Sequence, residues 1–210
     1  MTLLARKAGM SVGDFRHYWS GPHASLALGM DGISKYTQNR VEKVLWCSAG
    51  TPAFSADGIV ELFFASDEAM RAAQASSIGS RHIPQDEPNF LRGWTLCIVD
   101  TQGEAAADLP TKVIVPFART ADGGRERLAA ALEQAGERTR TSCSFDWTAS
   151  TARRESLWSE PVPPMGFVSI RLPSVAAAHE AFDEQGAVRA ALESELEGAV
   201  AYLVDELILR

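Results

Sequence analysis

The stretch Gly58-Ile-Val-Glu-Leu-Phe-Phe-Ala-Ser66 predicts a strand that leads into a helix, because a run of apolar residues ends at a serine that two acidic residues follow. The same order returns in Gly166-Phe-Val-Ser-Ile-Arg-Leu-Pro-Ser174, where the serine precedes a second helical pattern. The separation is 108 residues from glycine to glycine and also from serine to serine. A constant offset indicates an internal repeat, so we interpret the chain as two copies of one unit.

Hydrophobic periodicity predicts the order strand, helix, strand, strand, helix, strand in each copy. The expected elements are residues 2–7, 12–28, 33–44, 58–64, 67–75 and 93–100, and then residues 112–118, 123–135, 139–147, 166–172, 175–185 and 199–209. This βαββαβ order is that of a ferredoxin-like unit. We therefore expect an α+β fold with one unit at residues 1–103, a second at residues 109–210, and a linker at residues 102–110.

A ferredoxin-like unit covers one face of its sheet with helices and leaves the other face uncovered. Two units in one chain can cover each other's open faces, so we expect the two sheets to pack together as an intrachain pseudo-dimer. Sheet edges and helices would still be free, which leaves open whether two chains pair further as a homodimer.

The composition excludes several classes of protein. The 210 residues are 46% hydrophobic and 22% charged, which is typical of a globular chain. The net charge is −7 and the basic residues are scattered, so we expect no nucleic acid partner. No apolar run approaches the roughly 18 to 20 residues that cross a bilayer, and Arg6 and Lys7 interrupt the first apolar stretch, unlike a signal peptide. We expect a cytoplasmic protein without a membrane partner.

Polar specialisation concentrates in the first copy, and the first predicted helix carries most of it. Phe15, Trp19 and His23 recur every four residues, so they share one face of that helix. Pro22 removes a backbone hydrogen bond to the carbonyl of Tyr18 and predicts a kink just before His23. Two interpretations stay open for His23: a general acid or base on a cavity wall, or a hydrogen-bonded core histidine.

Other residues of the first copy could complete a site around His23. Asp86 or His82, before the last strand, could orient the imidazole or act as the complementary acid, although the acidic pair there is also typical of a solvated turn. Tyr36 shares a strand face with Gln38 and could hydrogen-bond a substrate oxygen. An apolar pocket would be lined by Trp19, Phe63, Phe64, Phe90 and Trp94, each of which could equally be plain core.

Five blocks of the first hundred residues resemble the EthD family, in the family's order. They are Leu3-Leu-Ala-Arg-Lys-Ala-Gly-Met-Ser11, then Phe15 with Tyr18-Trp19 and His23, then Tyr36-Thr-Gln-Asn39, then Asp57-Gly-Ile-Val-Glu-Leu-Phe-Phe64, and Asp86-Glu-Pro-Asn-Phe90. The resemblance implies a dimeric α+β barrel with a ligand cavity between sheet and helices. It also implies a role in degrading xenobiotic ethers or in cofactor-free tailoring of aromatic and polyketide compounds. Within its third block, Asn39 joins Gln38 as a candidate substrate-binding residue.

The chain departs from the family pattern in two places. Gly21-Pro22 stands before His23 where polar residues are more usual. The second copy has Arg125-Glu-Arg-Leu-Ala-Ala-Ala-Leu-Glu133 in place of a Trp-x-x-x-His helix, so it resembles a degenerate copy that has lost the site. We therefore expect one site in the chain.

Motifs of other chemistries are missing from the sequence. It contains no P-loop, GxGxxG, GxSxG or HExxH, its three cysteines form no CxxC pair, and His17 and His23 point apart on their helix, so we expect no metal and no cofactor. The leading hypothesis is a cofactor-independent, lyase-like enzyme that uses His23 on a hydrophobic aromatic or polyketide-like molecule, by elimination, retro-aldol cleavage or cyclisation. The alternatives are a cofactor-free or haem-assisted oxygenase and a non-catalytic ligand-binding accessory protein.

Overall fold

Eight antiparallel strands form a closed barrel in the computed structural model, which describes residues 1–210 apart from 49–52, 104, 107 and 122–123. Around the barrel the order is β1-β3-β2-β10-β5-β8-β7-β4. The barrel strands are β1 (Thr2–Arg6), β2 (Ile33–Cys47), β3 (Gly58–Phe64), β4 (Leu91–Gln102), β5 (Thr111–Phe117), β7 (Ser142–Ala152), β8 (Gly166–Leu172) and β10 (Val200–Ile208). A separate two-stranded sheet pairs β6 (Arg119–Thr120) with β9 (Leu196–Glu197).

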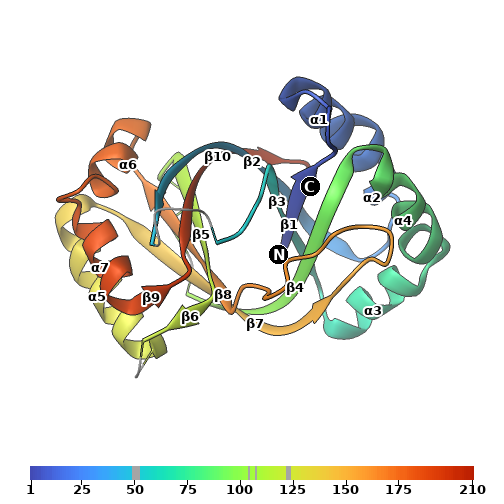
Figure 1. Cartoon of the computed structure of the whole chain (residues 1–210). Coiled ribbons are helices and arrows are strands. Elements are labelled where there is room, and N and C mark those ends of the chain that lie inside the picture. The colour runs from blue at the N-terminus through green and yellow to red at the C-terminus, as the bar shows by residue number, and fades with distance from the viewer. Residues whose placement is uncertain (49–52, 104, 107, 122–123) are drawn as a thin grey trace.

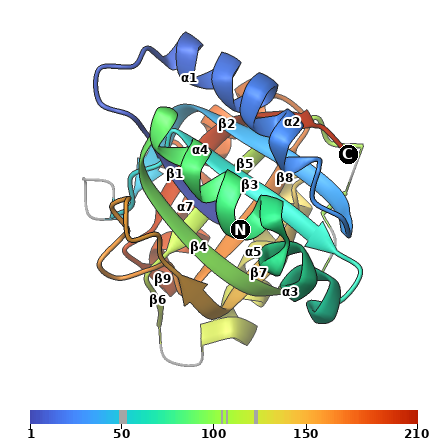
Figure 2. The same cartoon turned by 90° about the vertical axis from the view of Figure 1, so that its right-hand side faces the viewer.

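The helices form two groups on opposite sides of the barrel (Figure 1). The N-terminal half supplies α1 (Val12–Tyr18), η1 (Trp19–His23), α2 (Ala24–Ala27), α3 (Asp67–Ala75), η2 (Ile78–His82), α4 (Ile83–Asp86) and η3 (Glu87–Asn89). The C-terminal half supplies α5 (Gly124–Thr139), α6 (Val175–Ala181) and α7 (Ala187–Glu195). Figure 2 looks onto the N-terminal group, whose helices lie over β1 to β4. Each half of the barrel is thus covered on the outside by its own helices.

The two halves follow the same strand order and are hydrogen-bonded to each other at both edges. Taken in chain order within its half, each set of four strands is arranged fourth, first, third, second. The outer strands of one half pair with those of the other, β2 with β10 and β4 with β7. Where Arg40 faces Asp205 across the first seam, a salt bridge of 2.5 Å joins the two strands. The free sheet edges expected from the sequence are therefore absent at these two seams.

Several predicted elements have the expected bounds, and the differences have local causes. The repeated strands at residues 58–64 and 166–172 and the helix at residues 67–75 occur as predicted. β2 is longer than expected because it pairs with β10 up to Cys47. The single helix expected at residues 175–185 ends at Ala181, and α7 begins after Gly186. The start expected for the first C-terminal helix, Gly123, lies outside the described residues, as do residues 104 and 107 of the linker.

The repeated glycines and serines have matching structural roles. A Cβ on Gly58 would lie 2.5 Å from the ring of Trp19, and a Cβ on Gly166 would lie 2.8 Å from the ring of Phe117, so each glycine lets an aromatic ring lie on the strand. The hydroxyls of Ser66 and Ser174 each accept a backbone hydrogen bond of 3.1 Å and cap the following helix.

No helix among the described residues is long and apolar enough to cross a membrane. The three cysteines are unpaired thiols, and burial raises the pKa of Cys97 and Cys143, that of Cys143 to about 12. The part of the chain that the structure describes contains no group of three or more histidine, cysteine, aspartate or glutamate side chains that could hold a metal ion.

Candidate active site

His23 lies in a widened turn of the first helical run. The run spans residues 12–27 without a break, and Pro22 is accommodated by a π turn at η1 instead of the predicted kink. Pro22 has no N–H to bond the carbonyl of Tyr18, and the N–H of Ala24 bonds the carbonyl of Trp19, five residues back. The widened turn places His23 on the buried side of the helix, with only 9% of the residue exposed.

Asp86 holds the imidazole of His23. The Nδ1 atom of His23 lies 2.8 Å from Oδ2 of Asp86, and the hydroxyl of Tyr18 donates to Oδ1 at 2.6 Å. Asn89 also donates to Oδ1, at 3.3 Å. Burial acts to raise the pKa of Asp86, but the hydrogen bonds from Tyr18, His23 and Asn89 outweigh it, so the pKa is lowered and the carboxylate is charged near neutral pH.

The protonation of His23 follows from this contact. Burial lowers the pKa of His23 below 6.5, and the hydrogen bond to Asp86 opposes that shift only in part. The ring is therefore neutral near pH 7, and the charged carboxylate, which can only accept, places the ring proton on Nδ1. The phenyl ring of Phe90 packs against the imidazole, with 4.7 Å between the ring centroids. Nε2 is left as an unprotonated base.

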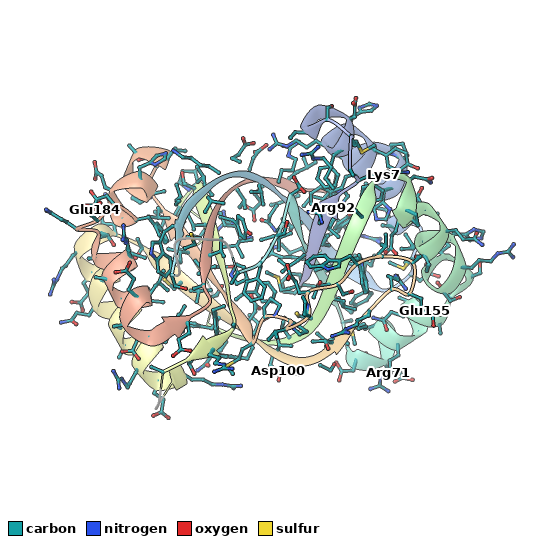
Figure 3. All side chains as sticks on the ribbon, in the orientation of Figure 1. Lys7, Arg71, Arg92, Asp100, Glu155 and Glu184 are labelled. Atoms are coloured by element: carbon teal, nitrogen blue, oxygen red, sulfur yellow. The ribbon has the colours of Figure 1, made fainter. Side chains whose placement is uncertain are left out.

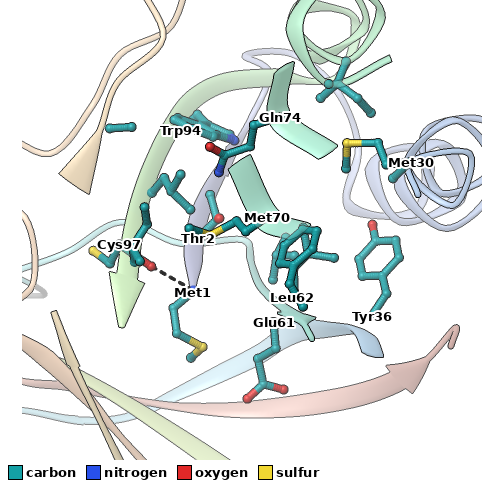
Figure 4. A pocket seen from close by; sticks show the side chains of 18 of the residues that line it. Met1, Thr2, Met30, Tyr36, Glu61, Leu62, Met70, Gln74, Trp94 and Cys97 are labelled. Atoms are coloured by element: carbon teal, nitrogen blue, oxygen red, sulfur yellow. Dashed lines mark hydrogen bonds between the residues drawn. The ribbon is translucent and has the colours of Figure 1, made fainter. Parts of the chain in front are cut away.

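A cavity of about 440 Å³ lies beside His23, between the sheet of the N-terminal half and its helices. Figure 4 shows the side chains of Trp94, Gln74, Met70, Leu62, Met30 and Tyr36 around it. The lining is mostly apolar near these residues and includes carboxylates, such as Glu61 and Asp146, towards the barrel interior. A space of this size fits a small organic molecule.

Tyr36 presents a hydrogen-bond donor to the cavity. Its hydroxyl oxygen accepts a hydrogen bond of 2.8 Å from Nε2 of Gln38, and the same Gln38 nitrogen donates to the carbonyl of Trp19 at 2.9 Å. Burial raises the pKa of Tyr36 to about 12, so the phenol keeps its proton. Because Gln38 occupies the oxygen as a donor, the phenolic hydrogen is available to an acceptor in the cavity.

The structure brings some of the predicted residues together and separates others. His23, Tyr36, Phe63 and Trp94 line the cavity, and Asp86 contacts His23. Trp19, Gln38 and Phe90 are fully buried behind the lining and position those side chains.

Two predicted residues lie elsewhere. His82 is exposed on η2 and does not line the cavity, so Asp86, the other candidate, holds His23. Asn39 donates to the carbonyl of Ile59 and to Glu61, on the opposite strand face from Tyr36, because side chains alternate along β2.

The sequence analysis missed a charged pair at the cavity. Nε and Nη2 of Arg154 donate to the two carboxylate oxygens of Glu87 at 2.8 and 3.3 Å. Burial raises the pKa of Glu87 to about 7 even though Arg154 opposes the shift. Arg154 belongs to the C-terminal half, so a half expected to have lost the site contributes to the cavity of the other. No local pattern marks Arg154, because it lies 67 residues from Glu87 in the sequence.

Comparisons with known proteins agree with this architecture. The family model of the EthD domain matches residues 7–93. A crystal structure of an anthrone oxidase-like protein aligns over 99% of this chain and 91% of that chain, with a TM-score of 0.61 and 13% identity. A putative monooxygenase from Lactobacillus acidophilus NCFM aligns over 99% of this chain and 92% of that chain, with a TM-score of 0.53 and 9% identity. These likenesses show a shared fold. No curated protein matches the chain.

Proposed function

We propose that this chain, whose residues 7–93 match the family model of the EthD domain, is a small-molecule enzyme in which His23 removes a proton from a hydrophobic substrate. The observation that carries the proposal is the contact of 2.8 Å between His23 Nδ1 and Asp86, on the wall of a cavity of about 440 Å³. A neutral imidazole whose Nδ1 is held by a carboxylate has its basic nitrogen free for a substrate.

The surrounding residues support proton removal at this position. When Nε2 takes the proton, the imidazolium that forms is stabilised by the charged carboxylate of Asp86. The negative charge left on an aromatic or polyketide-like substrate would move to an oxygen, to which the phenol of Tyr36 can donate a hydrogen bond. The base and the donor belong to different elements, η1 and β2, and both line the same cavity.

The anion formed in this way has two fates, which define the leading function and its alternative. In a lyase-type reaction it expels a leaving group, cleaves a carbon–carbon bond or cyclises, and no cofactor is required. In an oxygenase-type reaction it transfers electrons to dioxygen. Two proteins with the same fold are named an anthrone oxidase-like protein and a putative monooxygenase, which favours testing the reaction with dioxygen beside the lyase-type reaction.

We further propose that residues 1–103 and 109–210 are two ferredoxin-like units that together form the barrel. The shared strand order of the halves and the matching Gly58 and Gly166 support this proposal. On this interpretation the chain is an internal counterpart of a dimer, with one cavity in its N-terminal unit.

The test is solvent deuterium exchange into a panel of aryl ketones and phenols, followed by NMR, with an oxygen electrode run in parallel. The expected result is His23-dependent exchange, with His23→Ala slower by roughly 10² to 10⁴-fold. His179→Ala is the control, because His179 is exposed on α6. Dioxygen consumption would select the oxygenase, a haem absorption band its haem-assisted form, and tight binding without exchange the accessory protein. Full exchange by His23→Ala would overturn the proposal.

A further inference from the structure

The segment between β7 and β8, residues 153–165, crosses onto the N-terminal half, and we call it the strap. The N–H of Trp94 donates to the carbonyl of Trp158 at 2.8 Å, and the N–H of Trp158 donates to the carbonyl of Arg92 at 3.0 Å. Ser159 donates to the carbonyl of Trp94, at 2.8 Å. Figure 3 shows Glu155 of the strap beside the N-terminal helices, whereas Glu184 lies on the far side of the molecule. The strap is thus fixed along β4.

The strap delivers two arginines to the cavity. Arg153 and Arg154 both line it, and they are the only arginine or lysine side chains among the described lining residues. The guanidinium of Arg154 lies over the ring of Trp94, 4.5 Å from its centroid, and is held by both oxygens of Glu87. Arg153 has neither contact; its Nη2 donates to the carbonyl of Pro161, at 3.5 Å. Arg154 is therefore the arginine whose position is fixed by neighbouring side chains, those of Trp94 and Glu87.

Glu87 shows which ligand Arg154 fits. A carboxylate that meets the guanidinium through two nitrogens is the planar, two-point contact that arginine makes best. Glu87 follows Asp86 directly in the chain, so one turn holds both the base, through Asp86, and the guanidinium, through Glu87. A ligand bound at Arg154 would therefore lie at the end of the cavity where His23 is located. Two of the other acids in the lining have partners of their own: Glu61 pairs with Lys112 at 2.7 Å, and Asp146 accepts from Thr101 at 2.6 Å.

We propose that Arg154 recognises a carboxylate on a planar aromatic substrate, which replaces Glu87 on the guanidinium while the aromatic ring occupies the apolar cavity beside Trp94. This inference rests on the proposed function only in calling the ligand a substrate, because binding of the acid does not require turnover. It narrows the substrate class from hydrophobic molecules in general to aromatic acids.

The released Glu87 side chain would take a proton from solvent. Burial raises the pKa of Glu87 to about 7; Arg154 on the strap opposes the shift, and Asp86 on the same turn adds to it. Losing Arg154 to the ligand removes the charge that favours the ionised form, so near neutral pH the carboxyl becomes protonated. Binding of the acid is then coupled to proton uptake.

The experiment is isothermal titration calorimetry of the full chain with 2-naphthoate and with the neutral 2-naphthamide as probes. The expected result is a preference of about tenfold or more for naphthoate, which Arg154→Gln abolishes and Arg153→Gln retains. Titration in two buffers of different ionisation enthalpy should reveal proton uptake with naphthoate, which Glu87→Gln removes. Glu87→Gln should also bind naphthoate several-fold more tightly, because the internal competitor is gone.

Arg154→Gln leaves a buried Glu87 without its partner, which could destabilise the fold. The double variant Glu87→Gln/Arg154→Gln removes that carboxylate as well and therefore provides a second test of the role of Arg154. It should bind naphthamide as the parent does and show no preference for naphthoate. Equal affinity of the parent for both probes, no saturable binding of naphthoate, or equal losses in the two arginine variants would overturn the inference. His23→Ala should keep the preference, so failure of naphthoate binding and failure of the deuterium exchange test are separate results.

Discussion

The two halves of the molecule share a strand order but differ in what lies between sheet and helices. In the N-terminal half this space is a cavity lined by His23, Tyr36 and Trp94. In the C-terminal half Leu128 and Leu132 of α5 are buried in the largest apolar cluster of the described residues. A groove of about 480 Å³ between α5 and β7 has no histidine, tyrosine or arginine among its described lining residues.

This difference teaches that two things are encoded by different residues: the arrangement of strands and helices that both halves share, which we call the frame, and the site. The frame depends on glycines, capping serines and strand pairing, which both halves retain. The first helix differs most between the halves: in one half it contains a π turn that buries His23, and in the other it is a regular helix of 16 residues. The halves still depend on each other, because the C-terminal half supplies Arg154 to the cavity.

The largest expected effect tests what the N-terminal half has gained. Asp86→Asn should slow His23-dependent deuterium exchange by about 10³-fold, about 4 kcal/mol of barrier, because the amide neither fixes the Nδ1 proton nor stabilises the imidazolium. The NMR exchange assay measures it. Asp183→Asn, on the surface of the C-terminal half, should leave the rate unchanged, and an equal loss in both variants would contradict the assignment.

The second effect tests whether the buried cluster of the C-terminal half is packed more tightly than the cavity wall of the N-terminal half. Leu128→Ala should lower the free energy of unfolding by about 3 kcal/mol, because it opens a void in a fully packed cluster. Met30→Ala, on the cavity wall, should cost about 1 kcal/mol, since that side chain already borders open space. Urea titration measures both, and equal losses would remove the distinction.

The third effect tests the shared frame. Gly58→Ala and Gly166→Ala should each lower the free energy of unfolding by about 2 kcal/mol, because the new methyl group meets the ring of Trp19 in the first variant and the carbonyl of Asp146 and the ring of Phe117 in the second. Only the change at Gly58 should also weaken naphthoate binding, since Trp19 belongs to the turn that places His23. Thermal unfolding measures the loss of stability, and calorimetry measures the loss of naphthoate binding. Equal losses of binding in the two variants would show that the N-terminal half alone does not determine the site.

The smallest effect is a dependence on pH. The carboxyl of Glu87 titrates near 4.5 when unfolded and near 7 when folded, so between these values the folded chain holds a proton that the unfolded chain has lost. The free energy of unfolding should therefore fall by about 1 kcal/mol from about pH 6 to 7.5, and Glu87→Gln should remove that part of the slope. Glu133→Gln, exposed in the C-terminal half, is the control for urea titrations at each pH; a slope unchanged by Glu87→Gln would contradict the assignment.

The sequence allowed prediction of what local patterns encode. The repeated strands and the capped helix at residues 67–75 have clear local signals, and they occur with the expected bounds. The spacing of Phe15, Trp19 and His23 also placed His23 on a buried face. Asp86 and His82 remained equivalent in the sequence, because only the fold decides which of them reaches His23.

What escaped prediction depends on distant contacts. Pro22 indicated a disturbed helix, but whether the backbone kinks or widens depends on neighbours that hydrogen-bond its backbone groups, such as Gln38 on β2, which donates to the carbonyl of Trp19. Arg154 is placed by the strap's hydrogen bonds to β4, which join residues more than 60 positions apart. The closing of one seam likewise depends on the pairing of β10 with β2, strands from near opposite ends of the chain.

The two seams of the barrel also govern how the protein is made. At a synthesis rate of about 5–20 residues per second, the N-terminal half waits roughly 5 to 20 seconds before its last edge partner, β10, leaves the ribosome. Until their partners emerge, β7 for β4 and later β10 for β2, these two strands are unpaired edges, which attract other strands and promote aggregation. Closing the ring joins residues as distant as Arg40 and Asp205, which makes the step slow. The cavity is therefore completed late in folding, once strap and seams have closed over a half that was translated first.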